Sequence, residues 1–182
     1  MKKILNILLC MLLLGSCKNE SSVIEETAEE IHVQKGVLYY KSSPFSGSLI
    51  SYYEVGNQKR FIKIYHKGKL HGKECYWFSN GKLASERSYS HGVKTGKHVG
   101  FWPNENLKFE YYFNTKGLHH GAANEWFSNG VPLRSFNYVN GKEEGCQKMF
   151  NPDGSLRSNY VVLHGERFGL IGLKKCDAVF AM

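Results

Sequence analysis

The sequence predicts an all-β fold: an elongated antiparallel meander of about five to six β-hairpin repeats, each about 24 residues long, in a single sheet. Three observations support this fold class. Glycines recur with a fixed period, Asn-Gly or Asp-Gly dipeptides fall at a constant phase, and the segments between them are rich in aromatic and β-branched residues. A helical alternative fails because glycine and asparagine interrupt every stretch long enough to form a useful helix.

The period comes from a Gly-x-x-x-Gly motif. Counted from Gly47, the second glycines of successive motifs are separated by 25, 24, 25, 24 and 24 residues. The five pairs are Gly68 and Gly72, Gly92 and Gly96, Gly117 and Gly121, Gly141 and Gly145, and Gly165 and Gly169. A fixed period in this range is typical of repeat architectures. We therefore expect each motif to form the turn that leads from one hairpin into the next.

A second turn is predicted nine residues after the second glycine of each unit. Asn80-Gly81, Asn129-Gly130 and Asp153-Gly154 stand at this phase, and such dipeptides are strong signals for tight hairpin turns. Glu105 takes the place of the glycine in one unit. That unit must turn by another route, for which an asparagine in the left-handed region is one solution.

The strands between these turns carry strand-forming residues, for example in segments 74–78, 107–113, 125–127 and 134–139. A pair of large apolar residues follows the second glycine by five and six positions. The pairs are Tyr52 and Tyr53, Trp77 and Phe78, Phe101 and Trp102, Trp126 and Phe127, and Met149 and Phe150. Because neighbours in a strand point to opposite faces, the stacked pairs are expected to form two apolar ridges.

These ridges supply the candidate binding residues: Tyr53, Trp77, Phe78, Phe101, Trp102, Trp126, Phe127 and Phe150. An exposed apolar patch of this extent tends to mark a contact site. A single hairpin is marginal in water, so the array should be stabilised by stacking between neighbouring units, with atypical units at its ends. We expect residues 35–46 to be the first strand of the array and residues 167–182 to close it.

The first residues read as a targeting signal. Lys2 and Lys3 precede an apolar run at 4–14, which is too short to span a bilayer, since that needs roughly 20 residues. The following Leu14-Gly15-Ser16-Cys17 resembles the lipobox of bacterial lipoproteins. The resemblance implies that residues 1–16 are removed and that Cys17 becomes a lipid-modified N-terminus. The alternative is an ordinary cleaved signal peptide.

The mature chain divides into two parts. Residues 17–34 hold five glutamates against one lysine, which predicts a solvated acidic tether, with a short helix over 23–31 as the alternative. Residues 35–182 form the predicted repeat domain, with 21 basic and 11 acidic residues and a net charge of about +10. Such a surface suits a protein or anionic partner of the cell envelope, whereas export makes nucleic acid an unlikely target. Lys18 after Cys17 favours the outer membrane if the organism is Gram-negative.

Several features resemble the variant MORN repeat: Asn-Gly-Lys-Leu at 80–83, Gly-Lys-Leu-His-Gly at 68–72, and the tyrosine and glycine that end each unit. Proteins of this type are grouped as a YwqK-type family and labelled antitoxins. The resemblance covers residues 44–169 and implies an elongated antiparallel sheet that mediates contacts with lipid or protein. The antitoxin label fits an exported lipoprotein poorly, because a cytoplasmic toxin would be out of reach.

No catalytic motif is present, so we expect no enzyme activity, no metal and no cofactor. His71 and His120 lie two units apart, too far to share an ion, and are expected on turns at the sheet edge. Cys75 and Cys146 are too distant for a disulfide, whereas Cys146 with Cys176 remains open. The predicted function is a non-enzymatic binding scaffold. The alternatives are an antitoxin and a metal or thiol carrier that uses Cys176 with His164.

Overall fold

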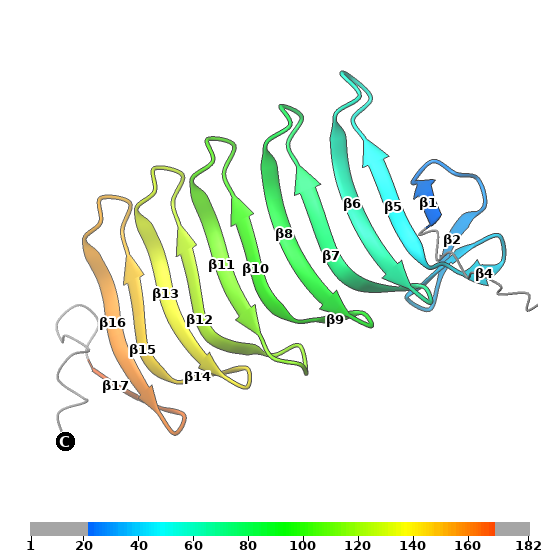
Figure 1. Cartoon of the computed structure of the whole chain (residues 1–182). Helices are drawn as coiled ribbons and strands as arrows, with labels where there is room; N and C mark the ends of the chain where they lie inside the picture. Colours follow the sequence, from blue (N-terminus) through cyan, green and yellow to red (C-terminus); the bar gives the residue numbers. More distant parts are fainter. Residues whose placement is uncertain (1–21, 170–182) are drawn as a thin grey trace, which may run out of the picture.

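The computed structural model describes residues 22–169, which form an extended, curved sheet of hairpins side by side (Figure 1). The predicted signal peptide (residues 1–16), Cys17 and Cys176 lie outside these residues. The N-terminal strands are β1 (Ser22–Glu25), β2 (Ile31–Gln34), β3 (Val37–Tyr40) and β4 (Ser43–Pro44). The repeat strands are β5 (Gly47–Tyr52), β6 (Lys59–His66), β7 (Lys69–Trp77), β8 (Leu83–Ser90), β9 (Val93–Lys94), β10 (Gly96–Phe101), β11 (Leu107–Phe113), β12 (His119–Trp126), β13 (Pro132–Val139), β14 (Lys142–Glu143), β15 (Gly145–Phe150), β16 (Leu156–Leu163) and β17 (Glu166–Phe168).

The strand order confirms the predicted fold class. The main sheet runs β1-β5-β6-β7-β8-β10-β11-β12-β13-β15-β16-β17, and the short strands β9 and β14 pair with β8 and β13. All neighbours from β5 to β17 are antiparallel and follow the order of the chain, as a meander requires. Only β1 joins in parallel, beside β5. Within residues 22–169 there is no helix long and apolar enough to cross a membrane.

The first glycine of most motifs closes a two-residue turn at one edge of the sheet, which we call the lower edge because it lies at the bottom of Figure 1. Its turns follow β6, β8, β11, β13 and β16. Lys67-Gly68 and His91-Gly92 have positive φ at both positions (49° and 75°, 50° and 86°), which defines the mirror-image turn that suits twisted strands. The Gly92 N–H also donates to the carbonyl of Leu70 in the preceding unit (2.7 Å), so the turn ties neighbouring units together.

The opposite, upper edge carries a longer loop that follows β5, β7, β10, β12 and β15. In the loop after β7, the Gly81 N–H donates to the Phe78 carbonyl (2.9 Å) and Gly81 takes a φ of 79°. Asn80 is not left-handed; its Oδ1 instead accepts from the Lys82 N–H (3.0 Å). The strand pairing shifts register between Tyr76 and Trp77, which marks a β-bulge beside the loop.

In the unit that lacks this glycine, Glu105 occupies its position and forms the turn. Glu105 itself adopts the left-handed conformation, with a φ of 70°, and its N–H donates to the Trp102 carbonyl (2.8 Å). The suggested left-handed asparagine is therefore wrong. Asn104 Oδ1 instead accepts from the Asn106 N–H (3.2 Å). The Asn104 side chain therefore stabilises the turn while its backbone does not adopt a positive φ.

The two 25-residue spacings arise where one turn is longer. The loop after β5 closes from the Tyr53 N–H to the Gln58 carbonyl, one residue further along the chain than the closure from Phe78 to Lys82. Between β11 and β12 the lower turn is also extended, with the Asn114 N–H donating to the Leu118 carbonyl (2.9 Å). The period therefore tolerates an extra residue at either edge without changing the strand order.

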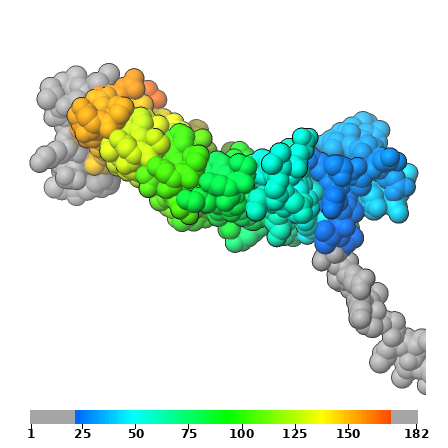
Figure 2. Space-filling view, turned by 90° about the horizontal axis from the view of Figure 1, so that it is seen from above, coloured from blue at the N-terminus to red at the C-terminus, as the bar shows by residue number. Residues whose placement is uncertain are grey.

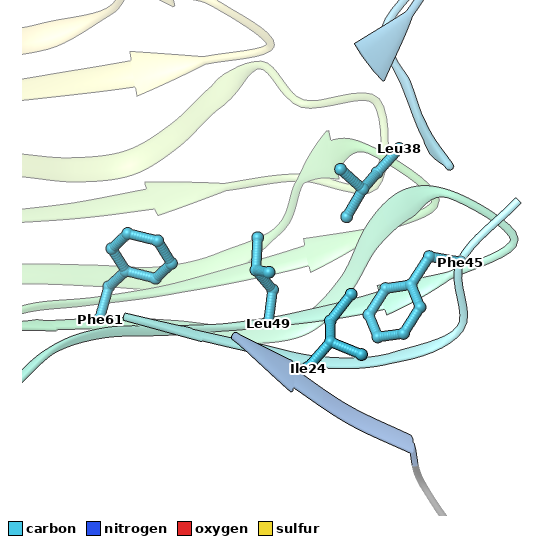
Figure 3. Packing of buried hydrophobic residues seen from close by; sticks show 5 residues of the cluster. All are labelled: Ile24, Leu38, Phe45, Leu49 and Phe61. Carbon is cyan, nitrogen blue, oxygen red and sulfur yellow. The ribbon is translucent and has the colours of Figure 1, made fainter. Parts of the chain in front are cut away.

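Residues 22–46 differ from the sequence-based expectation. The segment 22–34, predicted as part of a solvated tether, contains β1 and β2, and β2-β3-β4 form a small second sheet. Ile24, Leu38 and Phe45 from this segment pack against Leu49 and Phe61 of the repeat sheet, all at most 8% exposed (Figure 3). Residues 22–46, which contain β1 to β4, thus cover the first hairpin as a cap.

Beyond this cap the repeat sheet is a single layer. The described chain is an elongated, twisted body in which successive hairpins follow one another from the cap toward β17 (Figure 2). Eleven gaps of about 4.8 Å between the strands of the main path give a length on the order of 50 Å. Outside the cap no second layer covers residues 22–169. Side chains such as Phe109 and Tyr111 of the central hairpins therefore stay partly exposed, whereas His98 and Phe113 are buried among their neighbours.

Candidate binding surface

The predicted aromatic residues gather along the upper edge. Trp77, Phe101, Trp126 and Phe150 end their strands, whereas the other four candidates fall in or beside the loops that follow. These four are Tyr53, Phe78, Trp102 and Phe127. All eight are half-buried, so each keeps part of its ring accessible.

These rings also join one unit to the next. The Tyr53 hydroxyl donates to the Trp77 carbonyl (2.9 Å), and Trp102 Nε1 donates to the Trp126 carbonyl (3.0 Å), in both cases 24 residues along the chain. The β-bulges interrupt the two-residue alternation on which the prediction of two ridges depends. The structure therefore places the aromatic pairs in one row beside the loops, and their role in binding stays a prediction.

Three turns of the lower edge are strongly basic, whereas the turns after β13 and β16 contain Glu143, Glu144 and Glu166. The turns that follow β6, β8 and β11, taken with flanking strand residues as 66–73, 90–97 and 114–121, contain six lysines and five histidines and no acidic residue. Lys73 and Lys97 form ion pairs with Glu86 and Glu110 on the neighbouring strands (2.6 and 2.5 Å). The upper loops differ, because Glu54, Glu105 and Asp153 stand there with few lysines. The two edges of the sheet thus carry different charge.

The histidines of this edge have a structural role. Nδ1 of His71 accepts from the His91 N–H (3.3 Å), and Nδ1 of His120 accepts from the Asn140 N–H (3.4 Å), so each binds the turn of the next unit. The ring of His66 lies 5.6 Å from that of His71. Within residues 22–169, no group of three or more His, Cys, Asp or Glu residues is arranged to hold a metal ion. His71 and His120 lie near the start of β7 and β12, so their predicted position at the sheet edge is confirmed, although they are strand residues next to the turns.

The middle of one sheet face carries a stack of rings. Phe109 lies over Gly100, where an added Cβ would come within 2.2 Å of the Phe109 ring. Phe109 also stacks on Tyr111, with ring centroids 4.8 Å apart and planes inclined by 14°. Phe113 follows on the same face, two residues further along β11. The glycine therefore makes room for the aromatic stack.

A charge network flanks this stack. The Tyr111 hydroxyl donates to Glu125, which also forms an ion pair with Arg134. Burial, reinforced by the hydrogen bond to the Glu125 carboxylate, raises the pKa of Tyr111 to about 12. Tyr111 therefore remains a neutral hydrogen-bond donor at physiological pH.

Two histidines border the same rings. His98 is 3% exposed, and its Nε2 donates to the Ser88 carbonyl (2.8 Å). Its ring lies 4.5 Å from that of Phe113, which in turn lies 4.4 Å from His119. Burial lowers the pKa of both histidines below the usual value. Both imidazoles are thus neutral near pH 7.

The central cluster of rings and histidines was not predicted from the sequence. A signal was present, because Phe109, Tyr111 and Phe113 alternate along one strand and must share a face. The contacts with His98 and His119 depend instead on strand register, which pairs His98 with Tyr111 and Phe113 with His119. That register includes a bulge between Tyr111 and Phe113, which the residue pattern does not reveal.

Within residues 22–169 the two cysteines form no recognisable centre. Cys75 and Cys146 are both free thiols on half-buried strand positions, and burial raises the pKa of Cys75. Their separation agrees with the expectation that they do not bond to each other. The pairing of Cys146 with Cys176, like the carrier alternative that uses Cys176, falls outside the described residues.

The hairpin of β7 and β8 has the geometry of a repeat unit, with a bend at Gly72, a loop closed at Gly81 and a return to the turn at His91. Residues 70–91 match the MORN repeat variant. The matched MORN segment covers this one hairpin, and the same turn geometry recurs in the neighbouring hairpins. No curated protein matches the sequence. A repeat β scaffold is therefore the coarse description that the match supports.

Proposed function

We propose that this chain is a non-enzymatic, YwqK-type lipoprotein of the bacterial cell envelope, whose repeat sheet is a scaffold for a partner protein or an anionic surface. The observation that carries the proposal is the single-layer sheet. Within residues 22–169 no second layer covers the central hairpins, the row of half-buried rings or the basic turns of the lower edge. Apolar and charged surface in this quantity is typical of a contact site. We do not extend the proposal to an antitoxin role, because an exported protein cannot meet a cytoplasmic toxin.

The basic lower edge supports the anionic part of the proposal. Lys67, Lys69 and Lys116 lie on lower turns and form no ion pair among the described residues. A lysine near an anionic membrane surface contributes about 1 kcal/mol, and the attraction falls off within a Debye length. A row of such turns at one edge of an elongated sheet can therefore rest on a surface while the two faces remain accessible to protein.

Vesicle co-sedimentation tests this arrangement with the chain that lacks residues 1–17, which removes the proposed anchor. We expect binding to vesicles that contain anionic lipid, loss of most binding in K67Q/K69Q/K116Q, and loss of binding at high salt. The matched control K59Q/K82Q/K108Q removes the same charge from other positions and should bind nearly as the unmodified chain. Equal weakening by both triple variants would show that net charge alone, and not the lower edge, governs binding.

The anchor is tested with the full chain in bacterial cells fed a labelled fatty acid. We expect label on the protein and its recovery in the membrane fraction, because two or more acyl chains give stable attachment where one gives only marginal binding. Cys17→Ser should abolish the label and release the protein from the membrane. Cys75→Ser is the matched control and should leave both unchanged. Undiminished labelling of Cys17→Ser would refute the lipoprotein assignment.

A further inference from the structure

The central face contains a small cavity of about 220 Å³. Its walls come from β8, β9, β10, β11 and β12, so four successive strands of the main sheet and the short strand β9 contribute to it. The lining residues are Arg87, Lys94, His98, Phe109, Tyr111, Phe113 and His119. A cavity of this size accepts one side chain or a small molecule, and it is too small for a helix or a strand.

Each charged or imidazole side chain that lines the cavity is basic. The nearest acidic side chains are already engaged: Glu74 contacts Arg87 (3.8 Å), and Glu125 binds Tyr111 and Arg134. Lys94 has no carboxylate partner among the described residues, and its Nζ lies 5.3 Å from the centre of the Phe113 ring. The charge of Lys94 is therefore not neutralised by a carboxylate of the described residues, whereas that of Arg87 is.

His119 adds an unused polar atom. Its Nδ1 is buried and has no hydrogen-bond partner, which is unusual because buried polar groups are nearly always paired. The ring is held in place by Phe113, Tyr138 and Tyr111, with centroids 4.4, 5.2 and 5.4 Å away. The imidazole of His119 and the ammonium group of Lys94 both line the cavity, so both can donate to an acceptor there once the ring is protonated.

We propose that this cavity receives the carboxylate of an acidic side chain presented by a partner protein, with Lys94 and His119 as its ligands. The inference rests on the proposed scaffold function and specifies the chemistry of its protein partner. Charge complementarity favours an anion, and the rings of Phe109 and Phe113 lower the local dielectric, which strengthens the attraction between the carboxylate and Lys94.

Binding should be coupled to the protonation of His119. Lys94 and Arg134 oppose a positive charge on this ring, and Tyr111, Tyr138 and Phe113 cover it. A bound carboxylate would favour the protonated ring, which can then donate a hydrogen bond to it. By thermodynamic reciprocity, the carboxylate raises the pKa of His119 and lower pH strengthens carboxylate binding.

The test uses the full chain in a non-ionic detergent and a capped Gly-Gly-Glu-Gly-Gly peptide as the probe. The imidazole signals of His98 and His119 are followed by NMR as the probe is added. We expect saturable shifts of His119, a raised His119 pKa at saturation, and affinity weakened about tenfold in Lys94→Gln, because a charge-assisted contact is lost. The matched control Lys142→Gln removes an exposed lysine from a lower turn outside the cavity and should bind as the unmodified chain.

Three results would overturn the proposal. The first is equal binding of a probe with glutamine in place of glutamate, and the second is equal affinity of Lys94→Gln and the unmodified chain. The third is displacement of the glutamate probe by inorganic phosphate at lower concentration, which would make the cavity a phosphate site. Lys94 is unchanged in the vesicle variants, so failure here is distinguishable from failure of the scaffold proposal.

Discussion

At the scale of single residues, the repeat depends on backbone positions that favour glycine. Gly68 and Gly92 occupy the same place in successive lower turns, with φ of 75° and 86°. Their surroundings differ. A Cβ on Gly68 would lie 2.3 Å from Val37 Cγ1 and 2.7 Å from the Leu38 carbonyl, whereas a Cβ on Gly92 would meet nothing closer than 3.8 Å. An alanine at Gly92 would therefore meet backbone strain alone, whereas an alanine at Gly68 would meet both backbone strain and steric overlap.

Gly92→Ala should lower the free energy of unfolding by about 1 to 2 kcal/mol, the cost of a left-handed residue with a Cβ. Gly68→Ala should lower it by more than about 3 kcal/mol, because the cap must also move away from the turn. Urea unfolding followed by circular dichroism measures both values. Equal losses in the two variants would contradict the contact between the turn and β3.

His98 gives the fold a predicted dependence on pH. Burial lowers its pKa in the folded chain, so the unfolded chain binds more protons as pH falls below the ordinary value of about 6.5. The stabilisation is therefore complete above that pH and is lost as pH falls toward the depressed folded value.

His98→Gln is a suitable variant, because Gln147 stands at the equivalent position and is fully buried. We expect the midpoint of urea unfolding to fall less between pH 8 and pH 5.5 in this variant than in the unmodified chain. The control His91→Gln alters an exposed turn residue and should retain the full fall. A His98→Gln variant with unchanged pH dependence would show that another group is responsible.

At the scale of elements, the two parts of the chain are stabilised differently. The cap and first hairpin share a layered apolar core, whereas the later hairpins rely on strand pairing, ring contacts and ion pairs along one sheet. Cross-strand pairs of this kind contribute roughly 0.2 to 1 kcal/mol each. The first hairpin should therefore be the most sensitive to loss of an apolar side chain.

Phe61→Ala tests this contrast. Phe61 is 3% exposed in the core beneath the cap, so its truncation should cost about 3 to 5 kcal/mol of unfolding free energy. Phe168→Ala, at the far end on β17, should cost less than about 1 kcal/mol, because that side chain is 49% exposed. Comparable losses measured by urea unfolding would contradict the view of a capped, single-layer array.

The difference between the cap and the hairpins also explains which parts of the fold could be predicted from the sequence. The hairpins follow from local signals, because turn glycines and alternating strand residues act within a few positions of one another. The cap depends on Ile24 meeting Leu49 across 25 residues, and the acidic composition around Ile24 indicated a tether. The aromatic row was visible as a period, but the Lys94 and His119 cavity requires the strand register and a bulge.

At the scale of the whole molecule, the shape itself carries the functional argument. A ribbon about 50 Å long exposes far more surface per residue than a compact domain, and its exposed side chains include rings on the face and lysines along one edge. Exposed apolar surface of this extent favours aggregation unless a partner covers it. We therefore expect contacts with one partner at positions far apart along the sheet.

Site-specific photocrosslinking in cells tests this central claim most directly. A photoreactive residue is placed at Phe109 on the face, Trp126 at the upper edge or Lys116 at the lower edge, with Glu29 on a cap turn as the control. The scaffold account predicts a crosslinked product of the same partner from at least two of the three sheet positions and none from Glu29. Products from all four positions at the same level, or from none, would contradict it.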